Sequence, residues 1–194
     1  MVTEQQRESQ DQDRRPSTLL SSNDLTIVPF IPEGDGFNAN DVFLSQLFIK
    51  TVEDGLHKTV FFEGSIQDAM DFISLAKRKS TVMAFVFQGQ ECAGYAWLTP
   101  INGNYAFPHF CFFKEVWGKT SHELGEMLLR YWFSWEDAKG PLLDVLIGVI
   151  PDFNVKAQHF VEDVGAVRLG MIPRFFRDRD GTRRDGAIYY WTQE

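Results

Sequence analysis

Two side chains that can do proton-transfer or nucleophilic chemistry stand two positions apart in an aromatic stretch of the chain. His109 and Cys111 lie in the segment 104–113, which is rich in Phe and has the composition of a β-strand. In a strand the two side chains share one face of the sheet. Imidazole is suited to proton transfer near neutral pH, and a Cys–His pair can carry nucleophilic catalysis. The same surroundings fit a half-buried structural histidine and a small buried apolar cysteine, which is the commoner situation for both residue types.

A second group of candidate residues marks two expected helix starts. Gly118, Lys119, Thr120 and Ser121 stand between the aromatic strand and an amphipathic segment at 120–138. Backbone N–H groups at such a start, preceded by a glycine, can hold an anion. The simpler alternative is a plain strand-to-helix turn at Gly118, with the Lys119 side chain in solvent. Asn154 is expected to cap a later helix, a role that asparagine fills well.

The C-terminal region carries arginines that alternate with aspartates in the sequence. This alternation near a turn predicts a solvated hairpin with weak ion pairs. A site for an acidic partner is the alternative interpretation. The arginines are Arg174, Arg177, Arg179, Arg183 and Arg184, and the aspartates are Asp178, Asp180 and Asp185.

The elements that position these residues follow from hydrophobic periodicity. The pattern predicts mixed α/β (α+β) architecture, in which one central sheet of about seven strands is flanked by about four helices. We expect N-caps at Asn40 or Asp41 and at Ser65. Strands are expected at 25–31, in a hairpin over 81–98, and at 104–113, 142–150, 166–178 and 186–193; helices are expected from about 40, and at 65–79, 120–138 and 154–165.

Composition limits the classes of function. The chain has 194 residues, and its 19 Lys and Arg against 27 Asp and Glu give a net charge of -8. This balance argues against general nucleic-acid binding, which depends on neutralising phosphates. Two cysteines without paired spacing predict neither a disulfide framework nor a metal site. Residues 1–24 are polar and predict a tail that is flexible or bound to a protein partner, and 25–194 form the domain. We expect no signal peptide and no membrane segment, and a cytoplasmic location.

The order of elements resembles the GCN5-related N-acetyltransferase (GNAT) fold, and local motifs support the resemblance. The segment 88–97 resembles the second and third strands of that family, and 165–191 is similar to its final hairpin. Asn154, Ala157, Phe160 and Gly165 fall at the spacing of the family's helix after its fifth strand. The resemblance covers residues 25–192. In general character the chain is also similar to divergent GNAT-like proteins encoded by phages, some of which are carried in virions.

The resemblance implies where a cofactor would bind. In this family acetyl-CoA lies between the fourth and fifth strands, which splay apart, and often the fourth strand carries a bulge. Backbone N–H groups at the turn after the fourth strand hold its pyrophosphate. In this sequence that turn lacks the family's second glycine, and Glu115 and Glu123 lie near it. The cofactor-binding positions carried over are Cys111, Phe113, Gly118, Lys119, Thr120, Ser121 and Asn154.

The resemblance also implies direct attack of an amine on a thioester, assisted by a general acid and base. The family's usual acid is a Tyr, and Val161 stands at that position. His109 and Tyr189 are the catalytic residues that we expect, and Asp152, His159 and Tyr190 are further candidates.

Two hypotheses of function follow. The first is an acetyl-CoA-dependent N-acyltransferase. The second is a GNAT-fold protein without catalysis, which serves as a binding or structural subunit, such as part of a phage virion in the host cytoplasm, and assembles through residues 1–24. A toxin-type enzyme acting on aminoacyl-tRNA is disfavoured by the acidic net charge.

Overall fold

The computed structural model describes residues 20–22, 24–32 and 38–193. Its strands are β1 (Leu20–Ser22), β2 (Leu25–Pro29), β3 (Val82–Gln88), β4 (Glu91–Asn102), β5 (Tyr105–Phe112), β6 (Glu136–Asp137), β7 (Gly140–Pro141), β8 (Val145–Pro151), β9 (Val167–Arg177) and β10 (Arg183–Thr192). Its helices are α2 (Ala39–Glu53), α3 (His57–Val60), α4 (Ala69–Lys77), α5 (Lys119–Phe133) and α6 (Val155–Asp163), with a 3₁₀ turn η1 (Lys114–Val116).

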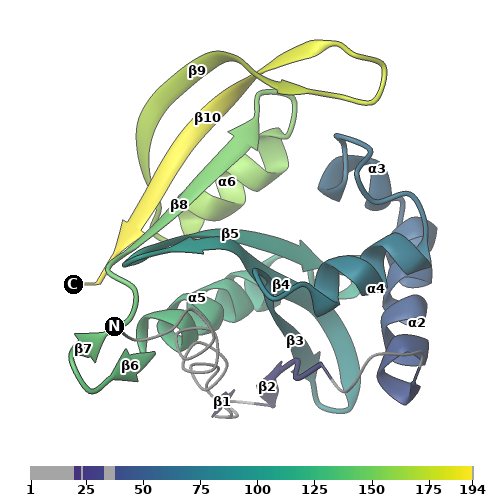
Figure 1. The fold of residues 1–194 in the computed structure, drawn as a ribbon, viewed down its shortest axis with the longest axis vertical. Coiled ribbons are helices and arrows are strands. Elements are labelled where there is room, and N and C mark those ends of the chain that lie inside the picture. The colour runs from purple at the N-terminus through teal and green to yellow at the C-terminus, as the bar shows by residue number, and fades with distance from the viewer. Residues whose placement is uncertain (1–19, 23, 33–37, 194) are drawn as a thin grey trace, which may run out of the picture.

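The main sheet has eight strands in the order β1-β2-β3-β4-β5-β8-β10-β9. All neighbours are antiparallel except β5 and β8, which run parallel. These two strands pair only at their beginnings, where Tyr105 faces Val145 and Ala106 faces Leu146. Beyond this point they diverge, as Figure 1 shows. The splayed pair that the GNAT resemblance implies is therefore present.

Both faces of the sheet are covered by helices, and the alternation along β4 shows how. Ala96 and Leu98 belong to a core on one face, which contains the buried side of α5 and part of α6. Tyr95 and Trp97 belong to a second core on the other face, with α2 and α4. Successive side chains of a strand point to opposite faces, so a strand covered on both sides is apolar throughout. Helices α5 and α6 thus flank one face of the sheet, and α2 to α4 flank the other (Figure 1).

Capping residues define where the helices begin. Asn38 caps α2 in a capping box with Asp41, so the predicted N-cap at Asn40 or Asp41 is wrong. Asp68 caps α4 through the Asp71 N–H, so the predicted start at Ser65 is also wrong. The Asn154 side chain accepts from the Ala157 N–H, which confirms its predicted role as the N-cap of α6.

The architecture confirms the predicted mixed α/β class, with differences in detail. The described residues contain five α-helices, and the pattern predicted about four. The hairpin β6–β7 and the short helix α3 were not predicted, because each is too short to show periodicity. The sheet also begins earlier than predicted: residues 20–22, assigned to the tail, pair with β2. The remainder of the tail, apart from Asp24, lies outside the described residues. None of the described helices is long and apolar enough to span a bilayer.

Candidate active site

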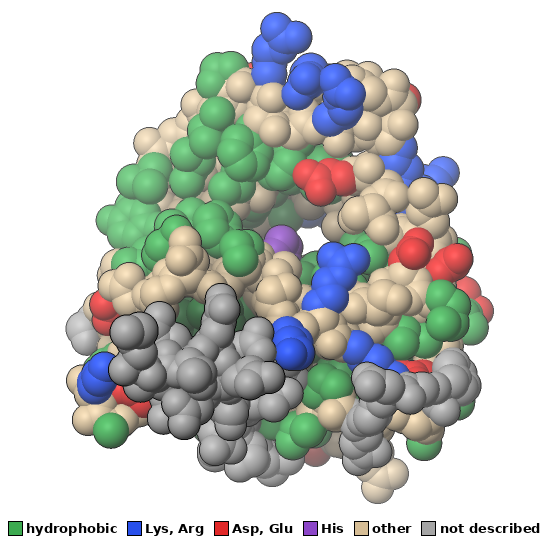
Figure 2. All heavy atoms as spheres, in the orientation of Figure 1, with side chains coloured by type: hydrophobic (Ala, Val, Ile, Leu, Met, Phe, Trp, Pro, Cys, Tyr) green, Lys and Arg blue, Asp and Glu red, His purple; other side chains and the backbone are tan. Residues whose placement is uncertain are grey.

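A cleft of about 900 Å³ occupies the space between the diverging strands. Its walls come from β5 and β8, from the start of α5, from α6, and from the segment between α2 and α4. Figure 2 shows a hollow in the middle of the molecule, between β8–β10 above and α2 to α4 below and to the right, with a histidine side chain visible in it. Because the cleft is lined from both faces of the sheet, two substrates can reach its centre from opposite sides.

One end of the cleft lies at the N-terminus of α5. Gly118 precedes this helix with φ +97° and ψ −136°, and no side chain caps the helix. The first intrahelical bond joins the His122 N–H to the Gly118 carbonyl. The amides of Lys119, Thr120 and Ser121 therefore have no partner in their own helix. A Cβ built on Gly118 would meet nothing within 4 Å, and Gly118 and Ser121 line the cleft, so the cleft extends to the start of α5. Such a turn can hold a phosphate group.

Aromatic and basic side chains border this end. The Trp117 indole N–H donates to the Phe112 carbonyl at 2.9 Å, which holds the ring beside the end of β5. Lys156 of α6 lies over the Trp117 ring, with its Nζ 4.8 Å from the ring centroid. Lys114 also lines the cleft. These two lysines balance the carboxylates of Asp54 and Asp163, which also line the cleft, and the positive end of the α5 dipole adds to them.

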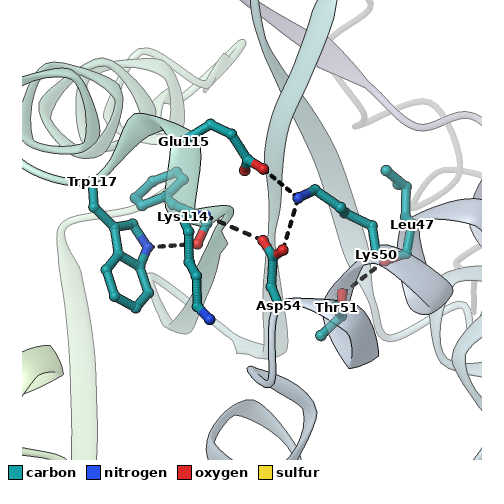
Figure 3. Close-up of polar contacts among 8 residues, drawn as sticks. Leu47, Lys50, Thr51, Asp54, Lys114, Glu115 and Trp117 are labelled. Carbon is teal, nitrogen blue, oxygen red and sulfur yellow. Dashed lines mark hydrogen bonds and ion pairs between the residues drawn. The ribbon is translucent and has the colours of Figure 1, made fainter.

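The acidic residue Glu115, which follows β5, pairs with a lysine of α2. Figure 3 shows its carboxylate facing Lys50, and the Glu115 Oε1 to Lys50 Nζ distance is 2.5 Å. Lys50 also contacts Asp54 Oδ1 at 2.7 Å, and both hydrogen bonds raise the pKa of Lys50. Burial opposes ionisation of Asp54, but hydrogen bonds from Lys50 and the Lys114 N–H give it a lowered pKa. The network ties α2 to the turn after β5, and Lys50 offsets one of its two carboxylate charges.

His109 lies within the cleft on the α2–α4 face of the sheet. Its ring stacks on Trp97 with centroids 4.7 Å apart and an angle of 7° between the planes. Nε2 lies 3.3 Å from the Thr99 carbonyl. A carbonyl only accepts, so Nε2 carries the proton and Nδ1 is the basic nitrogen. Water reaches the ring through the cleft, but the surrounding protein disfavours the charged form and lowers the pKa of His109 to about 4. The imidazole is therefore neutral at physiological pH.

Cys111 borders the same cleft, yet its thiol is not available for nucleophilic chemistry. The side chain is only 2% exposed and packs in the core on the α2–α4 side. Burial raises the pKa of the Cys111 thiol to about 12. A thiol that stays protonated is a poor nucleophile. Cys111 is thus a small buried core residue, the alternative that the sequence favoured.

The structure brings some of the predicted cofactor-binding residues together. Gly118, Ser121 and Asn154 line the cleft, as does Cys111. Thr120 and Lys119 do not line it, although their amides are at the open start of α5, and the Lys119 side chain pairs with Glu123 at 3.5 Å.

Phe113 does not reach the cleft. Its N–H donates to the Ala93 carbonyl at 2.9 Å, and its ring is buried in the core. Its backbone donor and its side chain are thus both engaged within the fold.

Of the other residues predicted to transfer protons, some line the cleft and others do not. His159 lines the cleft, whereas Asp152, Tyr189 and Tyr190 do not. The Tyr189 ring is fully buried, and its hydroxyl donates to Glu162 at 3.1 Å. Tyr189 therefore anchors α6 to the sheet and does not face the cleft.

The cleft is also lined by residues that were not predicted from the sequence. Trp97, Trp117 and Lys156 are examples, and all three line the cleft. Phe160 of α6 packs against Phe110 and Phe112 of β5 with centroids 5.6 Å apart in each case. The sequence places Trp97 in the strand that precedes the strand of His109. Whether Trp97 lies opposite His109 depends on the register of the hairpin, which the sequence does not reveal.

Comparison with known proteins supports the fold. No protein-family model matches the chain, and no curated protein sequence matches it. Solved structures do match. A probable acetyltransferase of the GNAT family from Chromobacterium violaceum has a TM-score of 0.71 at 13% identity, over 91% of this chain and 87% of that chain. The ribosomal L7/L12 α-N-protein acetyltransferase RimL in complex with coenzyme A has a TM-score of 0.68 at 13% identity, over 90% of this chain and 98% of that chain.

A third match is the spermidine N-acetyltransferase from Vibrio cholerae in complex with CoA and spermine. Its TM-score is 0.66 at 20% identity, over 88% of this chain and 96% of that chain. At such identities the likeness concerns the fold. The chain has the GNAT fold, and its structural neighbours are acetyltransferases.

Proposed function

We propose that the protein is an acetyl-CoA-dependent N-acyltransferase that transfers an acetyl group to an amine by direct attack on the thioester. The observation that carries the proposal is the cleft between β5 and β8, which joins the open N-terminus of α5 to His109. Fold alone does not define activity; the activity depends on the residues of this site. Structural neighbours crystallised with CoA or acetyl-CoA support the choice of cofactor.

The residues at the α5 end fit the cofactor's pyrophosphate. The amides of Lys119, Thr120 and Ser121 would hold it, with Gly118 allowing close approach of the backbone. Lys114 and Lys156 would add positive charge. The divergence of β5 and β8 leaves room for the remaining chain of the cofactor between the strands.

The chemistry requires little more than orientation and removal of one proton. Acetyl-CoA supplies the acetyl thioester: the amine nitrogen forms the C–N bond, the C–S bond breaks, and the proton lost by nitrogen balances the one taken up by the CoA thiolate. Neutral His109, with Nδ1 as its basic atom, would accept the proton from the nitrogen. Holding the two substrates together in the cleft supplies much of the rate.

The alternative, a binding or structural subunit that assembles through residues 1–24, rests mainly on residues outside the described part of the chain. The similarity to phage-encoded proteins also stays a prediction from the sequence. No contact among the described residues favours this alternative.

Thermal unfolding with acetyl-CoA tests the proposal. At a concentration 100 times its Kd, a ligand of the folded state stabilises by about 2.7 kcal/mol. For a chain of this length that is about 5–11 °C in Tm. Release of the CoA thiol in the presence of amines then measures turnover, and His109→Ala should abolish turnover while the shift in Tm persists. A Tm unchanged at millimolar acetyl-CoA would refute the proposal.

A further inference from the structure

The acceptor side of the cleft differs in character from the cofactor side, and this difference points to a class of amine. If the cofactor occupies the α5 end, as the proposed function requires, the acceptor must come from the opposite face of the sheet. His109 lies on that face, together with Trp97 of β4 and the segment between α2 and α4. The inference that follows rests on the proposed function and adds the identity of the acceptor.

Aromatic and aliphatic side chains dominate this side. Phe62, from the connection between α3 and α4, meets Phe153 at the end of β8 edge to face, with ring centroids 5.6 Å apart. Phe62 makes a similar contact with Phe176 of β9 at 5.0 Å. The lining side chains here are Leu56, Val60, Phe62, Trp97, Pro108 and Phe153. Such a wall favours a flat apolar group, which can add edge-to-face or stacked contacts.

The hairpin between β9 and β10 joins this wall to α3. Arg179 donates to the carbonyls of Phe61 and Ile66 at 3.4 and 3.3 Å, which bridges the hairpin to the segment before α4. Arg184 pairs with Asp178 at 2.9 Å and lies over the Phe153 ring. Arg184–Asp178 is an ion pair within the hairpin, of the kind that the sequence predicted, whereas Arg179 ties the hairpin to the segment before α4.

Carboxylates that could bind or deprotonate a cationic amine are already engaged. Among the described residues that line the cleft, the acidic ones are Asp54 and Asp163. Asp54 accepts from Lys50 and from the Lys114 N–H. Asp163 lies 3.5 Å from His122 on the α5–α6 side of the sheet. An ammonium ion entering this largely apolar side of the cleft would give up part of its hydration without gaining a carboxylate that is free of other contacts, which is costly.

We infer that the acceptor is an aromatic amine whose nitrogen is bonded directly to the ring. An alkylamine, like the lysine side chain with its pKa of about 10.4, is protonated at neutral pH and must lose a proton before it can attack. The nitrogen of an aromatic amine is already uncharged, because its lone pair is delocalised into the ring. It needs no carboxylate to bind it and no strong base to activate it.

His109 suits this acceptor. Once nitrogen has attacked the thioester carbon, it carries a positive charge and becomes far more acidic than the free amine. A weak base such as neutral His109, with its pKa of about 4, can then accept the proton. The proton leaves nitrogen for His109 Nδ1, the C–S bond breaks, and the CoA thiolate takes up a proton, so that the reaction is balanced.

A panel of four amines tests the inference, with release of the CoA thiol as the readout. The panel is aniline, benzylamine, cyclohexylamine and spermidine, each at neutral pH with acetyl-CoA. We expect kcat/KM for aniline to exceed that for benzylamine and for cyclohexylamine by at least about tenfold, equivalent to about 1.4 kcal/mol, and spermidine to give only the background rate. Equal or higher kcat/KM for benzylamine, cyclohexylamine or spermidine would overturn the inference while leaving the proposed function intact.

Two matched variants test the aromatic wall. Phe153→Leu keeps an apolar side chain but removes the ring, and should raise KM for aniline about threefold to tenfold. Phe175→Leu is the control, because Phe175 is similarly exposed (48% against 43%) but does not line the cleft. An equal effect of both variants on KM would contradict the inference. Acetyl-CoA affinity, measured separately by calorimetry, should be unchanged in both variants. Failure of the wild-type protein to bind acetyl-CoA would instead remove the proposed function, and this inference with it.

Discussion

Gly118 adopts a backbone conformation that is almost restricted to glycine, with φ +97° and ψ −136°. Replacing it with Ala introduces no clash, since a Cβ there meets nothing within 4 Å. The effect of Gly118→Ala is therefore backbone strain alone, about 1–3 kcal/mol. If the turn keeps its conformation, this strain lowers the free energy of unfolding, which corresponds to a fall of about 2–12 °C in Tm.

If the turn of the variant relaxes to another conformation instead, the cost of the strain appears as a lower affinity for acetyl-CoA. Acetyl-CoA must then restore the conformation in which the α5 amides are open, and its affinity falls by about 5- to 150-fold. Calorimetric titration and urea unfolding together measure both parts, and their sum should be about 1–3 kcal/mol. The matched control is Gly140→Ala, because Gly140 has φ +117°, has equal free space, and lies in the β6–β7 hairpin away from the cleft. It should lose stability but keep acetyl-CoA affinity. Unchanged stability and affinity in Gly118→Ala, or equal losses of affinity in both variants, would refute the reasoning.

Three further predictions concern side chains in or near the cleft. The folded protein keeps His109 neutral down to about pH 4, whereas the unfolded chain protonates it near 6.5, so stability should fall as pH drops from 6.5 to 4. His109→Gln should show a smaller fall in urea midpoint over this range, and an identical pH dependence would contradict the lowered pKa of His109. Tyr189→Phe should cost about 0.5–1.5 kcal/mol in urea unfolding and leave turnover unchanged, because its hydroxyl bonds to Glu162; loss of turnover without loss of stability would restore the catalytic role. Cys111 should resist iodoacetamide at pH 8 until denaturant is added, and Cys111→Ala should retain turnover; rapid labelling of the native protein would show that the thiol is accessible.

The sequence was sufficient for features that depend on local periodicity. The continuous apolar stretch at β8 predicted a strand, because a strand that is covered on both faces is apolar throughout. The amphipathic pattern at α5 predicted a helix, because a helix that is buried on one side repeats apolar residues with helical spacing. Asn154 was found as a cap because its preference is local. The order of these elements was enough for the fold.

The partner of His109 could not be predicted, because it depends on one extra residue. In the β4–β5 hairpin Asn102 faces Tyr105 and Ile101 faces Ala106, but Leu98 faces Pro108. The extra residue lies in β4, whereas the family resemblance suggested a bulge in the strand equivalent to β5. A regular ladder would place Leu98 opposite His109; the bulge brings Trp97 there instead. A shift of one residue exchanges the faces of every side chain beyond it.

The pairing of the charged residue at the turn after β5 also could not be predicted from the sequence. Glu115 in the sequence suggested repulsion of an anion, but its partner Lys50 is 65 residues away on α2. Contacts between such distant positions leave no local pattern. The same holds for the aromatic wall, which joins Phe62, Phe153 and Phe176 from three separate elements.

Amide hydrogen exchange measured with and without acetyl-CoA tests the location of cofactor binding most directly. The amides of Lys119, Thr120 and Ser121 have no partner in their own helix and should exchange rapidly in the free protein. With saturating acetyl-CoA we expect these three amides to become protected, together with those of the β5 residues after Pro108 that line the cleft. Exchange at the start of α5 that stays unchanged at saturation, or protection confined to other parts of the sheet, would contradict the account.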